Sequence, residues 1–294
     1  MSDRVYAIDS AGSFALGPWT VRRVGYGAMQ LAGDNVFGPP RDRDEALSVL
    51  RAAVEAGVNH IDTAQYYGPG VVNELIREAL YPYPADLAIV SKLGARRDAN
   101  GAVLLFDEPD QLRQGLEDNL ATLGVDRLPA VNLRMIDQAK PGKKFDAQLA
   151  SLVRAREEGL IDGIGLSNIS LEQLLRAVEQ TDVVCVQNLF NLVDQSSADV
   201  LEECARRGIA FVPFFPIGGQ NRLLSSRVIA ALGARLRATP AQIALAWLLD
   251  LAPNILLIPG TRTRTHLAEN LEAATVELDD AARAELAEHF PAAR

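Results

Sequence analysis

Residues 59–68 read Asn-His-Ile-Asp-Thr-Ala-Gln-Tyr-Tyr-Gly, and this stretch decides how the chain folds. It begins as a short apolar strand and ends on a glycine turn, so Asp62 stands where the strand becomes a loop. Tyr67 follows in that loop, and a second apolar run, residues 87–91, ends on Lys92. In a parallel α/β protein the carboxyl ends of the strands form the active-site edge. We therefore expect these three ionisable groups to lie together at that edge.

The three side chains together suit proton donation. A tyrosine with an ordinary pKa of about 10 gives up its proton reluctantly near neutral pH. A nearby lysine ammonium favours the phenolate and is expected to lower the pKa of Tyr67, while the Asp62 carboxylate holds Lys92 in place. The trio therefore predicts a general acid that protonates an oxyanion. Each residue taken singly is explained as well by a turn cap, a packed ring or a solvated cation.

The combined pattern, D-T-A-x-x-Y-G followed by a strand-end S-K-x-G, resembles the aldo-keto reductase family, and the resemblance extends from Gly25 to about Ala273. It implies an α/β fold, a (β/α)8 TIM barrel with an N-terminal β-hairpin, that reduces carbonyl compounds with a nicotinamide cofactor. It also implies that Asp62, Tyr67 and Lys92 are catalytic.

Composition limits the classes of function. The chain has 294 residues, of which 48% are hydrophobic and 23% charged, and residues 1–294 are predicted to form a single barrel domain. A net charge of −9 argues against binding to nucleic acids or anionic membranes. With two cysteines and no apolar run that resembles a signal peptide or a membrane span, we expect a cytoplasmic protein. The oligomeric state is not indicated.

Strands and helices alternate along the chain. Residues 13–22 predict a hairpin that turns at Gly17-Pro18, and residues 96–101 are interpreted as a polar insertion. Counting the strands that end at Asp62 and Lys92, eight barrel strands are predicted, the others at 24–28, 130–135, 161–166, 183–187, 209–213 and 254–258. Helices are predicted at 44–56, 71–80, 109–123, 145–158, 170–179, 197–206, 239–250 and 279–288.

The resemblance also assigns residues to the nicotinamide part of the cofactor. The segment after the first strand resembles the one that passes beside the nicotinamide: Gly27, Ala28, Met29 and Gln30. Two later strand ends resemble the residues that bind the carboxamide: Ser167, Asn168 and Gln187. Asn and Gln carry both donors and acceptors, which an amide-bearing ligand requires. Turn and cap chemistry is the alternative for Ser167 and Asn168.

The segment Phe214-Phe215-Pro216-Ile217-Gly218 is assigned to the same cofactor surface. The family usually has a tyrosine and a serine where Phe214 and Phe215 stand. Phe214 can stack on the nicotinamide as a tyrosine does, whereas Phe215 is a departure. It is expected to contact the ligand or to be a core residue.

Residues 258–270 have the form I-P-G-T-R-x-x-x-H-L-x-E-N, which resembles the segment that binds the adenosine part of NADPH. The free N–H groups at a helix start suit phosphate. The candidates are Gly260, Thr261, Arg262 and His266, with Glu269 and Asn270 facing adenine; Arg262 and His266 are assigned to the 2′-phosphate.

One catalytic position departs from the family. A histidine normally ends the fourth strand, but Arg134 occupies that place here. Arg134 would either bind substrate or form a salt bridge in the barrel mouth. The surrounding V-N-L-R segment resembles the bacterial pyridoxal reductase-like subgroup. We therefore expect NADPH-dependent reduction of a small carbonyl compound, with pyridoxal the leading substrate. A broad aldehyde or ketone reductase and a low-turnover NADPH-sensing protein are the alternatives.

Overall fold

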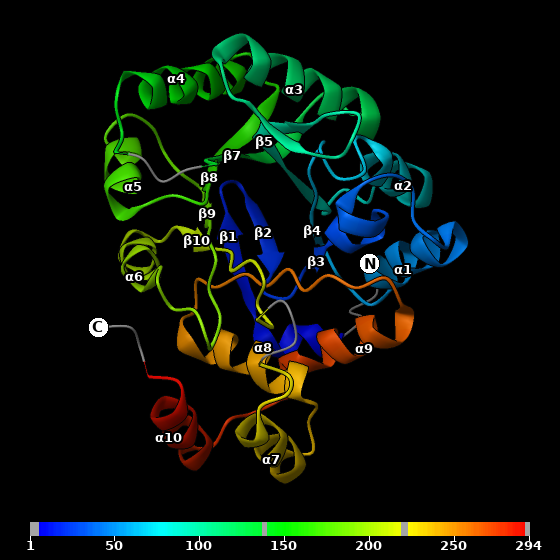
Figure 1. Ribbon diagram of the computed structural model, residues 1–294, viewed down its shortest axis with the longest axis vertical. Helices are drawn as coiled ribbons and strands as arrows, with labels where there is room; N and C mark the ends of the chain where they lie inside the picture. Colours follow the sequence, from blue (N-terminus) through cyan, green and yellow to red (C-terminus); the bar gives the residue numbers. More distant parts are fainter. Residues whose placement is uncertain (1–5, 137–139, 219–222, 292–294) are drawn as a thin grey trace.

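A ring of parallel strands surrounded by helices forms the centre of the molecule in the computed structural model, which describes residues 6–136, 140–218 and 223–291 (Figure 1). The strands are hydrogen-bonded in the order β3-β4-β5-β7-β8-β9-β10. Their bounds are β3 (Tyr26–Gly27), β4 (His60–Asp62), β5 (Ala88–Arg97), β7 (Leu128–Arg134), β8 (Ile161–Ser167), β9 (Cys185–Gln187) and β10 (Ala210–Phe211).

An eighth run of extended backbone closes the ring. Ile255 forms a parallel bridge with Phe211 of β10, and Leu257 forms one with Val24, just before β3. The Leu257 N–H donates to the carbonyl of Arg23 at 2.7 Å. The predicted eight-stranded barrel is confirmed, although its first and last strands are shorter in regular pairing than the sequence suggests.

The predicted N-terminal hairpin is also confirmed. Strands β1 (Ser13–Leu16) and β2 (Trp19–Arg22) pair antiparallel, and the hairpin lies across the barrel axis (Figure 1). Trp19 Nε1 donates to Asp162 Oδ2 at 3.1 Å, which places the hairpin at the amino ends of the strands. Its buried side chains share a cluster with inward-facing residues of the barrel, so this end is filled by apolar packing. The hairpin members are Leu16 and Val21, and the barrel members include Ala88, Ala130 and Ala210.

Helices cover the outside of the barrel. Several begin at a side-chain cap: Ser170 and Thr239, for example, form reciprocal capping boxes with the glutamines three residues later. Each predicted helix lies within two residues of an observed one at both ends. Their bounds are α1 (Arg43–Glu55), α2 (Val71–Leu80), α3 (Pro109–Leu123), α4 (Lys143–Glu157), α5 (Leu171–Val178), α6 (Ala198–Arg207), α7 (Arg227–Leu236), α8 (Pro240–Leu251), α9 (Arg264–Glu272) and α10 (Asp280–His289). Short 3-10 turns are η1 (Ala7–Ala11), η2 (Ala28–Leu31), η3 (Asp34–Val36) and η4 (Ala273–Thr275).

Two features differ from the sequence prediction. Residues 96–101 are not a separate polar insertion, because β5 continues to Arg97 and pairs antiparallel with β6 (Val103–Phe106). The Asp98 carboxylate accepts hydrogen bonds from the N–H groups of Asn100 and Ala102, which closes the turn. Helix α7 was not predicted, and it packs against α8 and α10 outside the barrel.

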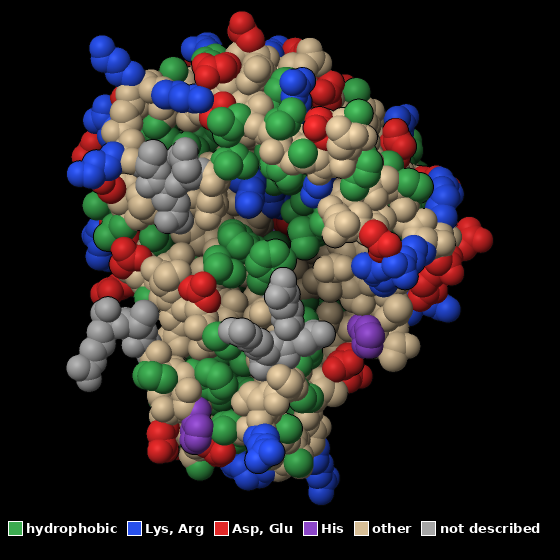
Figure 2. Space-filling view, viewed as in Figure 1, with side chains coloured by type: hydrophobic (Ala, Val, Ile, Leu, Met, Phe, Trp, Pro, Cys, Tyr) green, Lys and Arg blue, Asp and Glu red, His purple; other side chains and the backbone are tan. Residues whose placement is uncertain are grey.

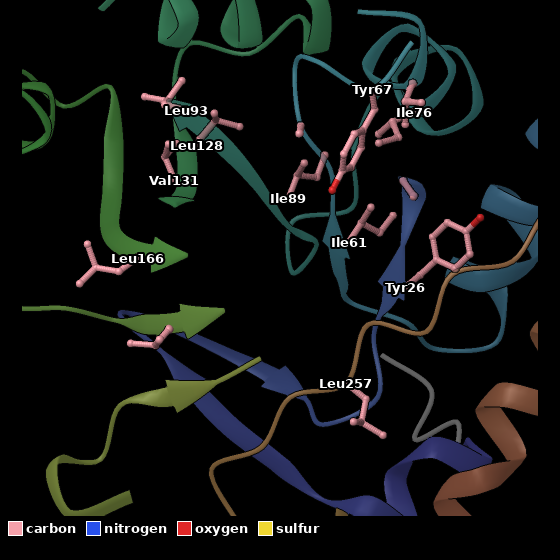
Figure 3. Packing of buried hydrophobic residues seen from close by; sticks show 14 of the residues in the cluster. Tyr26, Ile61, Tyr67, Ile76, Ile89, Leu93, Leu128, Val131, Leu166 and Leu257 are labelled. Carbon is pink, nitrogen blue, oxygen red and sulfur yellow. The ribbon is translucent and has the colours of Figure 1, made fainter. Parts of the chain in front are cut away.

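The main core lies between the barrel and its helices. Figure 3 shows Tyr26 and Tyr67 among aliphatic side chains of this core, including Ile61 and Ile89. No helix in the described ranges is long and apolar enough to cross a membrane. That residues 1–294 form a single domain stays a prediction.

Candidate active site

A buried ion pair joins the carboxyl end of β4 to Lys92 of β5, next to the point where β5 leaves its parallel pairing with β7. Lys92 Nζ donates to Asp62 Oδ1 at 2.5 Å and to the carbonyl of Thr63 at 2.9 Å. The second carboxylate oxygen of Asp62 accepts from Gln187 Nε2 at 2.8 Å. Both charged residues are 3% exposed. Because each charge is paired and further hydrogen-bonded, burial is tolerated and the ammonium is held in one place.

Tyr67 lies against this pair. Its ring centroid is 5.1 Å from Lys92 Nζ, and the residue is buried, 7% exposed. The expected lowering of the Tyr67 pKa is wrong for this structure. Burial raises the pKa of the phenol above its ordinary value and the Asp62 carboxylate adds to the rise, while Arg134 and Arg97 act in the opposite direction. The phenol therefore holds its proton at neutral pH.

A cleft of about 610 Å³ opens above these groups. Figure 2 shows a hollow near the middle of this face, with hydrophobic side chains and Lys or Arg side chains gathered around it. Most of the predicted catalytic and cofactor-binding residues line the cleft: Gly27, Met29, Gln30, Asp62, Tyr67, Lys92, Arg134, Gln187, Phe214, Phe215, Pro216, Ile217 and Gly260. Residues that the sequence did not single out also line it: Val36, Tyr66, Arg97, Val103, Ile258 and Pro259.

The remaining predicted residues lie outside this lining: Ala28, Ser167, Asn168, Gly218, Thr261, Arg262, His266, Glu269 and Asn270. The Ser167 hydroxyl is buried and has no hydrogen-bond partner in the described part of the chain. Ser167 is paired in register with Arg134 on one side and Gln187 on the other, so it adjoins the cleft. Asn168 Nδ2 donates to the carbonyl of Met135 at 2.8 Å.

Arg134 lines the cleft. Its guanidinium carbon is 5.8 Å from the centroid of the Phe214 ring. No hydrogen bond or ion pair joins its side chain to any residue within 6–136, 140–218 or 223–291. Phe215 is 46% exposed, which excludes the core alternative for this residue. Both residues therefore face the space that a ligand would enter.

Arg97 is a cleft residue that the sequence reasoning missed. Its Nε donates to the carbonyl of Tyr66 at 3.2 Å and its Nη1 to the carbonyl of Gly101 at 2.6 Å. It joins the loop that carries Tyr67 to the β5–β6 hairpin. The available signal was a cation a few residues after Lys92, where the strand was predicted to end, but the interpretation of residues 96–101 as an insertion placed Arg97 outside the barrel.

The predicted phosphate-binding end is more open. Arg262 is exposed, and its Nη2 donates to Gln30 Oε1 at 3.2 Å. Helix α9 begins just afterwards, with the Thr263 hydroxyl accepting from the N–H of His266 at 3.3 Å. The carbonyl of Thr261 is held from below by the Tyr26 hydroxyl at 2.6 Å. These contacts fix the start of the helix and leave the Arg262 side chain at the surface.

A closed eight-stranded barrel with a phenol beside a buried lysine–carboxylate pair, at the end where barrel active sites lie, can support general-acid catalysis. The family model described as "Aldo/keto reductase family" matches residues 23–290. The chain belongs to this family, as its motifs predicted, and is therefore an oxidoreductase.

Individual relatives agree with this assignment. Over 274 residues the chain is 48% identical to "Pyridoxine 4-dehydrogenase" of Escherichia coli (strain K12), covering 92% of this chain and 96% of the relative. A thermostable aldo-keto reductase solved with the inhibitor epalrestat superposes with a TM-score of 0.80 at 29% identity, covering 94% of this chain and 98% of that one. An aldo-keto reductase from Klebsiella pneumoniae, solved with NADP and acetate, has a TM-score of 0.79 at 21% identity, with 96% of both chains covered.

Proposed function

We propose that the protein reduces an aldehyde with NADPH, and that pyridoxal, giving pyridoxine, is its substrate. The cofactor, when bound, would supply a hydride to the carbonyl carbon, and Tyr67 would give its phenol proton to the carbonyl oxygen. The position of Tyr67 supports this role, because it lines the cleft and its ring centroid is 5.1 Å from Lys92 Nζ. Lys92 lies beside the phenol and stabilises the phenolate that forms, and Asp62 and Gln187 hold the lysine assembly in place.

The side chains and backbone around the cleft fit a nicotinamide cofactor. A Cβ added to Gly27 would lie 2.4 Å from the carbonyl of Ile258, so these two strand ends approach as closely as glycine allows. The unpaired Ser167 hydroxyl can bind an amide, and Arg262 at the open end can bind a phosphate. The NADP held by the Klebsiella pneumoniae enzyme supports the same cofactor here. Ser167, Gln187 and Arg262 would hold it, and it supplies the hydride.

Arg134 is the observation that carries the choice of substrate. Its guanidinium lines the cleft beside Phe214 and is always charged. Pyridoxal has a ring hydroxyl next to its aldehyde that ionises readily, and a guanidinium binds such an oxygen with a charge-assisted hydrogen bond. This contact would orient the aldehyde toward the hydride. The 48% identity with a pyridoxine 4-dehydrogenase supports the same substrate.

The test compares two substrates in one variant. Arg134→Leu should lose at least about tenfold more kcat/KM on pyridoxal than on an aldehyde of similar size that lacks the ring hydroxyl, because a hydrogen bond to a charged group is worth about 1.5–3 kcal/mol. Equal losses on both substrates would remove the substrate-binding role of Arg134 and leave a general effect on Tyr67.

Two other functions are separated by a simpler assay. A broad aldehyde and ketone reductase would turn over many test carbonyls with kcat/KM values similar to that for pyridoxal. A cofactor-sensing protein would bind NADPH but show almost no turnover with any reactive aldehyde. A cytoplasmic location belongs to the same proposal, and the two cysteines, Cys185 and Cys204, are buried and free of disulfides.

A further inference from the structure

A buried polar network lies behind the catalytic ion pair, between the barrel and helices α2 and α3. The Thr63 hydroxyl donates to Asn73 Oδ1 at 2.8 Å, and Asn73 Nδ2 donates to Asn119 Oδ1 at 3.0 Å. Asn119 Oδ1 also accepts from the Ser91 hydroxyl at 2.5 Å. All four residues are 0% exposed. Such a network is stabilising and rigid when every member is satisfied.

The network closes into a ring that includes the catalytic lysine. Thr63 follows Asp62, and its carbonyl accepts the Lys92 Nζ hydrogen bond at 2.9 Å. Ser91 precedes Lys92 on β5. The contacts therefore run from Lys92 to Thr63, from Thr63 to Asn73, from Asn73 to Asn119 and from Asn119 to Ser91. The peptide bond between Ser91 and Lys92 closes the ring. Both strand ends that carry the ion pair are tied to the same two amides.

A branch of the network reaches the loop that carries the tyrosine. Asn73 Nδ2 also donates to Gln65 Oε1 at 2.8 Å, and the Thr122 hydroxyl donates to the same oxygen at 2.9 Å. Gln65 lies in the loop between Asp62 and Tyr67. Asn73 is thus the residue through which strand β4, strand β5 and the Tyr67 loop are joined to the outer helices.

We propose that Asn73 is a positioning residue for the reaction, which acts by fixing the Lys92 ammonium and the Tyr67 phenol relative to each other. The proposal rests on the catalytic roles proposed above for these two residues. A displacement of about 1 Å, even when caused by a change far from the chemistry, can cost about a hundredfold in rate. An asparagine suits this place because its amide donates and accepts at once, whereas apolar residues of similar size do neither.

Two variants and their combination test this role. Asn73→Ala removes the junction, and Thr63→Val removes one hydroxyl at nearly constant volume while keeping the backbone carbonyl that binds Lys92. Each should lower kcat by about tenfold to a hundredfold, with the Kd for NADPH within about twofold of wild type. Because both act through one ring of contacts, the double variant should lose little more than the more severe single variant.

Asn59→Ala is the matched control. Asn59 is a buried asparagine that directly precedes β4, at the end of the barrel that the hairpin closes, where its side chain binds the backbone of Arg22 and Thr20. It should lower the melting temperature as Asn73→Ala does and leave kcat unchanged. Thr63→Val alone decides the question if Asn73→Ala does not fold.

Wild-type kcat in a folded Asn73→Ala, or in Thr63→Val where Asn73→Ala does not fold, would overturn the positioning role, as would losses that simply multiply in the double variant. A failure of the proposed function has a different signature, because it would appear as substantial turnover in Tyr67→Phe. An inactive Tyr67→Phe together with a fully active Asn73→Ala would remove the positioning role alone.

Discussion

The two ends of the cleft are built differently. At the nicotinamide end, Asp62 and Lys92 are buried, and each already has its hydrogen-bond partners without a ligand. At the proposed adenosine end, Arg262 is exposed, and its side chain makes one hydrogen bond, to Gln30, among the described residues. The ion pair of the first end is therefore already held by protein groups, whereas in the proposed binding mode the Arg262 guanidinium would gain a phosphate as a further charge partner. Groups that take part in the reaction must be held in a fixed geometry, whereas a side chain that only contributes binding affinity can stay adaptable until its ligand binds.

Removing the acid should have the largest effect. Tyr67→Phe keeps the ring packing against Tyr66 and deletes the proposed proton donor. We expect kcat to fall by about 10²–10⁴-fold while the Kd for NADPH stays near wild type, because a transition-state interaction alone is lost. Stopped-flow or steady-state turnover and a binding titration measure the two quantities. Near-normal turnover would show that another group supplies the proton, with Tyr66 the first to examine.

The second largest effect should be a loss of folding stability at acidic pH, caused by His60 near the catalytic ion pair. His60 lies below Asp62 on β4, and its Nδ1 has no partner among the described residues. Burial lowers its pKa from 6.5 to about 4; Lys92 adds to the shift and Asp62 opposes it. His60 is therefore protonated in the unfolded chain below about pH 6.5 but in the folded chain only below about pH 4. The free energy of unfolding consequently falls as the pH falls through this window.

The expected loss in free energy of unfolding between pH 7 and pH 5 is about 2 kcal/mol from this residue. Urea unfolding at the two pH values measures it, and His60→Leu provides the comparison because leucine does not titrate. The variant should lose less stability than wild type over the same interval. Identical pH dependence in the two proteins would mean that His60 is protonated without cost.

A change at Arg262, at the open end of the cleft, should weaken NADPH binding and leave kcat unchanged. Arg262→Ala removes a charge-assisted contact to the 2′-phosphate, so NADPH should bind at least about tenfold more weakly. NADH lacks this phosphate, and its affinity should stay within about twofold. Fluorescence titrations with both cofactors check the difference, and equal losses would show that Arg262 does not bind the phosphate.

The smallest effect should come from salt, which is expected to change the Kd for NADPH more than it changes kcat. Raising the ionic strength from roughly 0.1 M to 1 M shortens the screening length from about 10 Å to about 3 Å. The exposed contact of Arg262 should weaken, so the Kd for NADPH should rise a few-fold, while the buried pair should leave kcat at saturating cofactor nearly constant. A kcat that falls as steeply as affinity would indicate that the ion pair is open to solvent.

The fold could be predicted largely from the sequence because its signals are local. Apolar runs and helix stops recur in eight units, and the hairpin is marked by Gly17-Pro18. The weakest predictions were strands that pair over few residues, such as β10, and the β5–β6 hairpin. Strand β6 of that hairpin has no buried residue, since Val103, Leu104 and Leu105 are all exposed, so its periodicity carries little information.

The candidate site was predictable where residue type alone defines the chemistry. Asp62, Tyr67 and Lys92 came from their motifs, and the structure brings them together. The pKa of Tyr67 was not predictable, because it depends on how deeply the phenol is buried, which spacing in the sequence does not show. Asn73 and Asn119 were missed for a similar reason: each lies on the inner face of an outer helix, and their partnership across 46 residues appears only in space.

The hydrogen bond from Gln187 to Asp62 determines which face of the glutamine amide a ligand meets. A carboxylate can accept but not donate, so the Nε2 group must turn toward Asp62 and the carbonyl oxygen must turn away from it. Gln187 therefore presents its carbonyl oxygen, an acceptor, on the side away from Asp62. In the binding mode proposed above, the carboxamide group of the nicotinamide would bring an N–H to this oxygen, whereas the carboxylate of nicotinate would bring only another negative oxygen. One amide, oriented by the Asp62 carboxylate, would thus favour the amide form of the dinucleotide over its acid form.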